Sequence, residues 1–346
     1  MRQAVLTKPG SLELRELPRP DPAPGELVVR VELALTCGTD LKTYRRGHPK
    51  LPLPTPLGHE YTGTVAAVGA GVTRFREGDP IVAAPSAPCG ECGPCRRGLE
   101  NLCDRIDGTT MAWGAFADYI RIPAHVVRRN VFPRPVGLDL RQAALLEPLA
   151  CVVAGVERLD LVGRDVALVV GAGPIGLLFA ALLKRRGVPR VIVAGRRAAR
   201  LDAARALGAD EVIDLTAEPD LGPALRGRAP EGACTVVECV GTPDAWVSAV
   251  GVARKGGEVL LYGGCAAGTK VPIDAHRVHY DALTLKGAFH FTPTDVRQSL
   301  DLLVRRALPL ERLVSETYPL DRIQAAFDAL QGGETMKLAI VPGVAQ

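Results

Sequence analysis

Four cysteines lie close together in one short stretch of the chain that is rich in glycine and proline. Their spacing is C-x2-C-x2-C-x7-C, at Cys89, Cys92, Cys95 and Cys103. Four thiolates this close in sequence can surround one ion, and tetrahedral all-cysteine coordination is typical of a structural Zn²⁺. An iron–sulfur cluster also takes four cysteines, but it would not explain the second group of ligand-type residues described next. The spacing therefore predicts a structural zinc site.

The second group of ligand-type residues is scattered along the chain. Cys37 begins a Cys-Gly-Thr-Asp sequence, His59 and Glu60 complete a Gly-His-Glu sequence, and Glu147 precedes a proline. Each piece alone is weak evidence, because a single cysteine or histidine is more often a core residue than a ligand. Together they offer one thiolate, one imidazole and one or two carboxylates, and they leave a coordination position open. That donor set is typical of a catalytic Zn²⁺.

A glycine-rich turn predicts a dinucleotide site. It runs Gly171-Ala172-Gly173-Pro174-Ile175-Gly176, directly after a strand-like segment and directly before a helix-like one. The first glycine permits the tight turn, the second lets the backbone approach a pyrophosphate, and the third lets helix and strand pack closely. Phosphates then lie at a helix N-terminus, where free N–H groups favour anions. Two later turns, which contain Val240 and Tyr262, follow strands and are expected near the nicotinamide.

The end of the next strand indicates which dinucleotide is bound. Enzymes that use NAD place an acidic residue here for the ribose hydroxyl, whereas this chain has Gly195-Arg196-Arg197, with Arg200 one turn later. Guanidinium groups suit a 2′-phosphate. NADP is therefore favoured and NAD is the alternative, and Gly195→Asp is expected to reverse the preference.

Two kinds of secondary structure must position these residues. Short β-type runs broken by proline and glycine fill the first third of the chain and predict an antiparallel barrel or sandwich. From about residue 165, strands alternate with helices, which predicts a doubly wound parallel sheet. The last segment ends in a strand, Lys-Leu-Ala-Ile-Val-Pro, that we expect to return to the first domain. We predict an α/β protein with a catalytic domain at 1–149 and 290–346 and a dinucleotide-binding domain at 150–289.

Composition limits the class of partner. The 346 residues exceed twice the ~150 expected for one domain. A net charge of +4, from 42 basic and 38 acidic residues, is too small and too scattered to argue for nucleic acid. No apolar run approaches the roughly 20 residues of a membrane helix, and the first residues lack the apolar core of a signal peptide. We expect a cytoplasmic protein without membrane or nucleic-acid partners.

The order and separation of the Gly-His-Glu sequence, the four-cysteine segment and the glycine turn resemble the zinc-dependent medium-chain dehydrogenase/reductase family over essentially the whole chain. The sequences CGTD, GHEYTG, NLC and EPLA are most similar to its sorbitol (polyol) dehydrogenase branch, with threonine dehydrogenases close behind. The resemblance implies a GroES-like catalytic domain interrupted by a Rossmann domain, with the active site in the cleft between them. It also implies an alcohol or ketone substrate and a homodimer or homotetramer.

Within this resemblance, Cys37, His59 and Glu60 become ligands or near-ligands of a catalytic zinc. Glu147 corresponds to the carboxylate that stands beside the zinc and its water in polyol dehydrogenases. Thr39 corresponds to the hydroxyl that contacts the substrate oxygen and begins the proton relay.

Two neighbouring positions complete the comparison with the family. Asp40 is expected to orient a ligand imidazole. Lys42 stands where the family often has a histidine, and this departure affects the outer step of the usual proton relay.

Other functions remain as alternatives. One alternative is a dehydrogenase of the same fold whose substrate is L-threonine or another amino alcohol. An alternative from another functional class is a non-catalytic regulatory protein that binds zinc and NADP. The open coordination position of the second ligand group argues against it, because a regulatory protein needs no such position. A zinc-ribbon nucleic-acid binder is disfavoured because no aromatic stacking set or basic stripe accompanies the cysteines.

Overall fold

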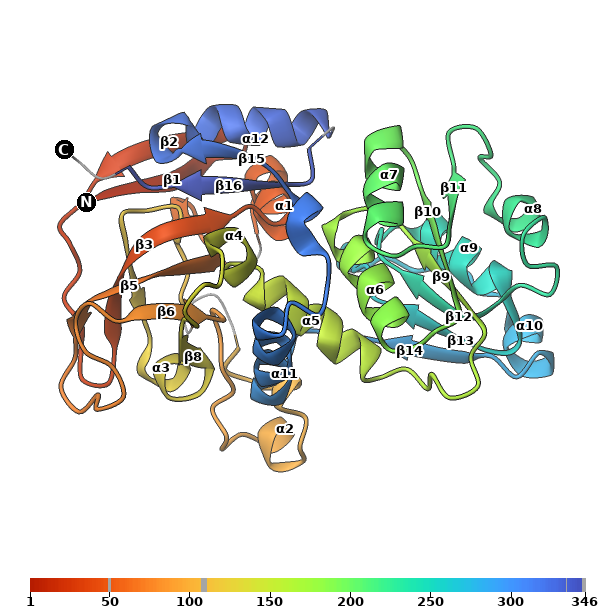
Figure 1. Cartoon of the computed structure of the whole chain (residues 1–346), viewed down its shortest axis with the longest axis horizontal. Coiled ribbons are helices and arrows are strands. Elements are labelled where there is room, and N and C mark those ends of the chain that lie inside the picture. Colours follow the sequence, from red (N-terminus) through yellow and green to blue (C-terminus); the bar gives the residue numbers. More distant parts are fainter. Residues whose placement is uncertain (49–50, 107–110, 334, 344–346) are drawn as a thin grey trace. The chain divides into compact units, whose positions relative to one another are not determined.

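The computed structural model describes residues 1–48, 51–106, 111–333 and 335–343. The chain forms two compact units, shown in Figure 1: Met1–Ala150 with Phe291–Arg305 and Val314–Gln346, and Cys151–His290 with Arg306–Leu313. The expected boundaries placed all of 290–346 with the first domain. Arg306–Leu313 instead belongs to the second unit, because the 3-10 helix η2 (Leu310–Leu313) packs against helices α6 (Pro174–Arg185) and α7 (Ala198–Ala206).

The first unit is built around a mainly antiparallel sheet. Its strands run in the order β15 (Val314–Pro319), β16 (Lys337–Val341), β3 (Leu27–Leu35), β5 (Glu60–Val68), β6 (Pro80–Ala83) and β8 (Val131–Pro133), and β7 (Tyr119–Ile122) also pairs with β3. A smaller sheet has the order β2 (Ser11–Glu16), β1 (Arg2–Lys8) and β4 (Thr55–Pro56). The final strand pairs antiparallel with β3, so the tail does return to this unit.

Short helices connect and cover these strands. They are α1 (Gly38–Arg46), α2 (Gly93–Arg96), α3 (Ala124–Asn130), α4 (Leu140–Ala143), α11 (Pro293–Val304) and α12 (Ile323–Gly332), with 3-10 turns η1 (Glu100–Leu102) and η3 (Leu320–Arg322). Helix α5 (Leu146–Val156) begins in the first unit and ends in the second. Tyr61, Phe116 and Phe327 are fully buried in the core of the first unit. Burying each such aromatic ring removes a large apolar area from water.

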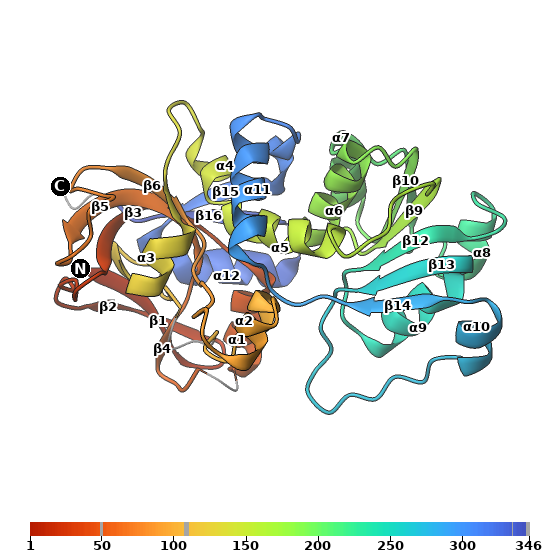
Figure 2. The ribbon, with the colours of Figure 1, turned by 90° about the horizontal axis from the view of Figure 1, so that it is seen from below.

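The second unit holds a six-stranded parallel sheet. The order is β11 (Glu211–Asp214), β10 (Arg190–Gly195), β9 (Val166–Val170), β12 (Ala233–Glu238), β13 (Ala253–Leu261) and β14 (Thr284–Gly287). Strand β9 is a continuous apolar run and every residue of β12 is buried, as expected for strands covered on both faces. Figure 2 shows α6 and α7 on one side of this sheet and α9 (Pro243–Val252) on the other, with α8 (Leu221–Arg226) and α10 (Ala275–Tyr280) nearby.

The strand order explains where ligands can bind. Strand β9 lies between β10 and β12. The chain leaves β9 for β10 and β11 on one side and later crosses to β12 on the other, so the carboxyl ends of β9 and its neighbours form the topological switch point. The predicted α/β class, a β-rich unit plus a doubly wound parallel sheet, is confirmed. Within the described part of the chain, no helix is both long and apolar enough to span a bilayer.

Candidate active site and metal centres

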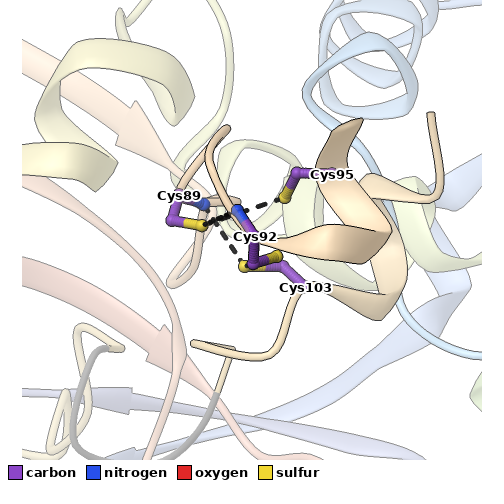
Figure 3. Close-up of side chains that lie close together, drawn as sticks. All are labelled: Cys89, Cys92, Cys95 and Cys103. Atoms are coloured by element: carbon purple, nitrogen blue, oxygen red, sulfur yellow. Dashed lines mark hydrogen bonds between the residues drawn. The ribbon is translucent and has the colours of Figure 1, made fainter. Parts of the chain in front are cut away.

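The four cysteines of the short segment converge on one point, as Figure 3 shows. The Sγ atoms of Cys89 and Cys95 lie 4.0 Å apart, and those of Cys92 and Cys103 lie 3.8 Å apart. Four sulfurs held about 2.3 Å from one ion at tetrahedral angles lie about 3.8 Å from each other, so the arrangement fits zinc. None of the cysteines forms a disulfide among the described residues. These four residues are called the cysteine lobe below.

Backbone N–H groups support the sulfurs of the cysteine lobe. Those of Glu91 and Cys92 both donate to Cys89 Sγ at 3.4 Å, and they lower the pKa of the Cys89 thiol to about 6. Burial raises the pKa of Cys95 to about 12. Because a metal binds the thiolate form, occupation of this centre displaces protons.

A second cluster brings together Cys37, His59 and Glu60, whose ligand atoms all lie within 4.8 Å of one another. Cys37 is the N-cap of α1, so its thiol stands at the free end of that helix and accepts the N–H of Thr39 at 3.4 Å. His59 and Glu60 lie where β5 begins, and both are buried. The donor set of thiolate, imidazole and carboxylate suits zinc.

Asp40 connects the two segments that supply this cluster. Its carboxylate accepts the backbone N–H groups of Cys37 at 3.0 Å and Gly58 at 3.2 Å, and Oδ1 lies 3.3 Å from Nδ1 of His59. This leaves Nε2 as the imidazole nitrogen for a metal. Burial lowers the pKa of His59, but the nearby Asp40 and Cys37 outweigh burial and raise it well above its usual range. A metal at this point competes with a proton for the ring.

The sequence analysis missed Lys337, the first residue of β16. Its ammonium is buried and donates to both oxygens of Glu60, at 2.6 and 2.5 Å, and to the carbonyl of Thr36 at 3.0 Å. Burial raises the pKa of Glu60 to about 7, although Lys337 opposes the shift. The only signal in the sequence is a lone lysine at the start of an otherwise apolar strand.

The other two residues expected here lie beside the cluster. Glu147 is in the first turn of α5, is 8% exposed, and interacts electrostatically with both Glu60 and Lys337. Thr39 is exposed next to Cys37 in the first turn of α1, and Lys42, further along that helix, is exposed as well.

The glycine turn in the second unit has the expected strand–turn–helix context. Gly171 follows β9 with a φ of 112°, and Gly173 is the N-cap of α6. A Cβ at Gly176 would lie 1.9 Å from the carbonyl oxygen of Gly171, so no larger residue fits there without moving the turn. Pro174 and Ile175 form the first positions of the helix.

A cleft of about 920 Å³ opens at this end of the sheet. Seven of the residues predicted to bind the dinucleotide line this cleft: Gly171, Gly173, Gly195, Arg196, Arg197, Arg200 and Val240. Tyr262 lies elsewhere, with its ring edge-on against Phe179 at 4.9 Å. Pro174, Ile175 and Gly176 belong to the turn and helix rather than to the lining.

Gly195 has no room for a side chain. A Cβ there would lie 2.5 Å from the Cβ of Ala172 in the glycine turn. The reversal of cofactor preference expected for Gly195→Asp stays a prediction, but this substitution is a poor test of it because the new side chain would also displace the turn. The three arginines that line the cleft offer a cleaner experiment.

A buried carboxylate that the sequence analysis did not single out organises the far side of this cleft. Glu238, the last residue of β12, accepts the N–H groups of Val240 at 2.6 Å and Gly241 at 2.9 Å through Oε1. Its backbone carbonyl accepts those of Tyr262 and Gly263. Both expected turns are thus fixed by one residue, and burial raises the pKa of its carboxyl.

Known proteins resemble this chain over nearly all its length. The family model of the alcohol dehydrogenase GroES-like domain matches residues 23–131, and that of the zinc-binding dehydrogenase matches 174–305. L-threonine 3-dehydrogenase of Deinococcus deserti is 33% identical over 94% of this chain and 93% of its own.

Two solved structures agree with these matches. A protein of Sinorhizobium meliloti 1021, solved bound to NADP, has a TM-score of 0.90 at 29% identity and covers 99% of both chains. An alcohol dehydrogenase of Thermus sp. ATN1 has a TM-score of 0.88 at 29% identity, over 99% of this chain and 100% of that one.

Proposed function

The chain belongs to the zinc-dependent medium-chain dehydrogenase/reductase family and is an oxidoreductase, and on this premise we propose that it transfers a hydride between a secondary alcohol and NADP. The substrate class we propose is a polyol or cyclitol. The observation that carries the proposal is the convergence of Cys37, His59 and Glu60 on one point, with the carboxylate of Glu147 beside them. A purely structural centre has no need of this mixed donor set.

Cys37 and His59 are the residues that would hold a catalytic zinc. Both oxygens of Glu60 already accept hydrogen bonds from Lys337. Glu147 is therefore the better candidate for the remaining carboxylate position. The cysteine lobe would hold a second, structural zinc.

The chain's own residues then have distinct tasks. When bound, zinc supplies Lewis-acid polarisation of the substrate oxygen and NADP supplies the hydride acceptor. Asp40 would hold the imidazole of His59, and the hydroxyl of Thr39 would accept the proton of the substrate hydroxyl. Lys42 replaces the histidine common in the family, so the outer path of that proton leads to solvent through other groups.

The preference for NADP rests on the lining of the cleft in the second unit. Arg196, Arg197 and Arg200 all face it, and the lack of space at Gly195 excludes the carboxylate that would bind ribose hydroxyls. Each charge-assisted hydrogen bond to a 2′-phosphate contributes roughly 1.5 to 3 kcal/mol. Discounted for solvent exposure, this corresponds to a preference of about 10- to 1000-fold.

Two assays test the proposal. A panel of polyols, cyclitols and amino alcohols is offered with NADP⁺ or NAD⁺, and turnover should occur with a secondary alcohol and disappear in Cys37→Ser. Titration should show tighter binding of NADPH than of NADH. Arg196→Ala should weaken the binding of NADPH only. Arg205→Ala should change the binding of neither cofactor, because Arg205 is an exposed arginine in the last turn of α7 that pairs with Asp202. Equal affinities in the wild-type protein would reject the NADP assignment.

L-threonine is the second candidate substrate, favoured by the 33% identity to an L-threonine 3-dehydrogenase. The amino-alcohol arm of the same panel decides between them, because a threonine dehydrogenase would oxidise L-threonine faster than any polyol. Binding of zinc and NADPH without turnover of any alcohol would instead support a regulatory protein.

We also propose that the protein forms a homodimer or homotetramer. Sedimentation of the purified protein would measure its oligomeric state.

A further inference from the structure

One aromatic side chain lies directly on a proposed metal ligand. The indole of Trp113 is stacked on the imidazole of His59, with ring centroids 4.8 Å apart and planes 3° from parallel. Only two tryptophans occur in the chain, and neither belongs to the motifs that predicted the site.

The indole is itself held in place. Trp113 Nε1 donates to the carbonyl of Pro56 at 2.6 Å. The next two residues, Gly114 and Ala115, both donate their backbone N–H groups to the carbonyl of Gly58, at 2.9 and 3.0 Å. Gly58 immediately precedes His59, so the backbone that carries the indole is tied to the backbone that carries the imidazole.

The two contacts on His59 restrain different motions. Asp40 Oδ1 lies 3.3 Å from Nδ1, and a contact at one atom of the ring restrains the position of that atom more than the tilt of the ring. A parallel aromatic face resists tilting, because any tilt brings ring atoms into collision. Trp113 also lines a separate cavity of about 570 Å³ in the first unit, whereas His59 is only 4% exposed. Removing the indole would open the imidazole to that cavity.

We propose that Trp113 is a positioning residue for His59. Its indole fixes the plane of the imidazole and keeps water from the imidazole face, and the metal is therefore held more tightly. The inference rests on the proposed zinc site at Cys37 and His59, and it goes beyond it by assigning this role to a residue outside the proposed set of metal ligands. Loss of a group that orients a metal-binding histidine typically weakens metal binding by about 10- to 100-fold.

The test measures release of Zn²⁺ to a chromogenic chelator from the full-length, zinc-loaded protein. Two zinc sites should give two kinetic phases of release. The phase that is missing in Cys37→Ser is the one that comes from the proposed catalytic site. In Trp113→Leu, which keeps apolar bulk without a flat face, that phase should be faster by about 10- to 100-fold. In Trp113→Phe, which keeps an aromatic face, it should stay within about 3-fold of wild type. Tyr119→Ala is the matched control, because Tyr119 lines the same cavity without contacting His59.

A spectroscopic measurement separates positioning from a general loss of stability. In the Trp246→Phe background, Trp113 is the sole tryptophan, and its emission should change in the same phase in which zinc leaves. Wild-type release rates in a folded Trp113→Leu protein, or equal acceleration in Tyr119→Ala, would overturn the inference. If Cys37→Ser removes no phase and no zinc, the proposed catalytic site itself fails, which is a distinct result.

Discussion

The cysteine lobe and the cluster of Cys37, His59 and Glu60 are both metal-type sites of the first unit, but they are built in opposite ways. The lobe draws its ligands from a stretch of 15 residues, 89–103, uses one kind of donor, and is half-exposed except for Cys103. The other cluster draws on segments far apart in sequence, mixes three kinds of donor, and surrounds them with buried charges. Four identical donors that complete the coordination of the ion suit a structural zinc. A mixed donor set that leaves one coordination position open suits a catalytic zinc, because a substrate can bind there.

The largest expected effect separates the two sites by activity. His59→Ala should lower kcat/KM by more than the roughly 100-fold typical of losing a group that merely orients a ligand. Binding of NADPH should change less than about 2-fold, because the dinucleotide cleft is lined by residues of the second unit. Steady-state kinetics and fluorescence titration measure these quantities. Near wild-type kcat/KM would reject the catalytic assignment of this cluster.

The converse substitution should affect stability rather than chemistry. Cys92→Ser removes one of four sulfurs, and loss of the metal should cost about 3 kcal/mol or more, or roughly 6–12 °C in Tm. Zinc content should fall from two to one per chain, and the remaining activity of folded protein should stay within a few-fold of wild type. Cys265→Ser, a half-buried cysteine outside both clusters, is the control and should keep both zinc ions. One zinc or none in the wild-type protein would contradict two full sites.

The buried charges around Glu60 predict that the stability of the metal-free protein depends on pH near neutrality. Glu60 has a folded pKa near 7, raised from 4.5 by burial, so the stability it contributes is present below its unfolded pKa and is lost as pH rises toward 7. Lys337→Met removes the ammonium that opposes this shift and should extend the loss above pH 7. We expect metal-free Lys337→Met to be about 3 kcal/mol less stable than wild type at pH 8.5, with a smaller deficit at pH 6.

Denaturant unfolding at the two pH values measures this deficit. The double variant Glu60→Gln with Lys337→Met is the control, because it leaves no buried carboxylate at position 60. Its difference from wild type should vary less with pH than that of the single variant. A deficit of equal size at pH 6 and pH 8.5 would show that Lys337 does not act through the charge of Glu60.

The smallest effect distinguishes the two carboxylates of the mixed cluster. Glu147→Gln keeps the size of the side chain and should lower kcat by about 10-fold while changing Tm by less than about 2 °C, if Glu147 rather than Glu60 faces the reacting groups. Glu60→Gln should instead act mainly on stability, because it removes the negative charge that pairs with the buried ammonium of Lys337. The reverse pattern in kinetics and thermal unfolding would exchange the two assignments.

The sequence by itself determined what depends on short-range geometry. The cysteine lobe, within 15 residues, and the strand–glycine–helix pattern at Gly171 each draw their groups from one short segment, so local backbone geometry can bring them together. The change from β-type runs to alternating strands and helices likewise revealed two kinds of domain. Cys37, His59 and Glu60 could be associated only through the chemistry of their donor atoms and through resemblance to a known family, because no local rule connects them.

Only the tertiary structure decided the contacts that cross the sheets. Lys337 reaches Glu60, 277 residues away, because β16 pairs with β3 and β3 pairs with β5, in registers that set Ala339 beside Leu35 and Leu35 beside Glu60. The stack of Trp113 on His59 and the close approach of Gly195 to Ala172 likewise depend on packing between separate segments. Strand register and side-chain packing are set by the whole fold, since each depends on which surfaces are buried together.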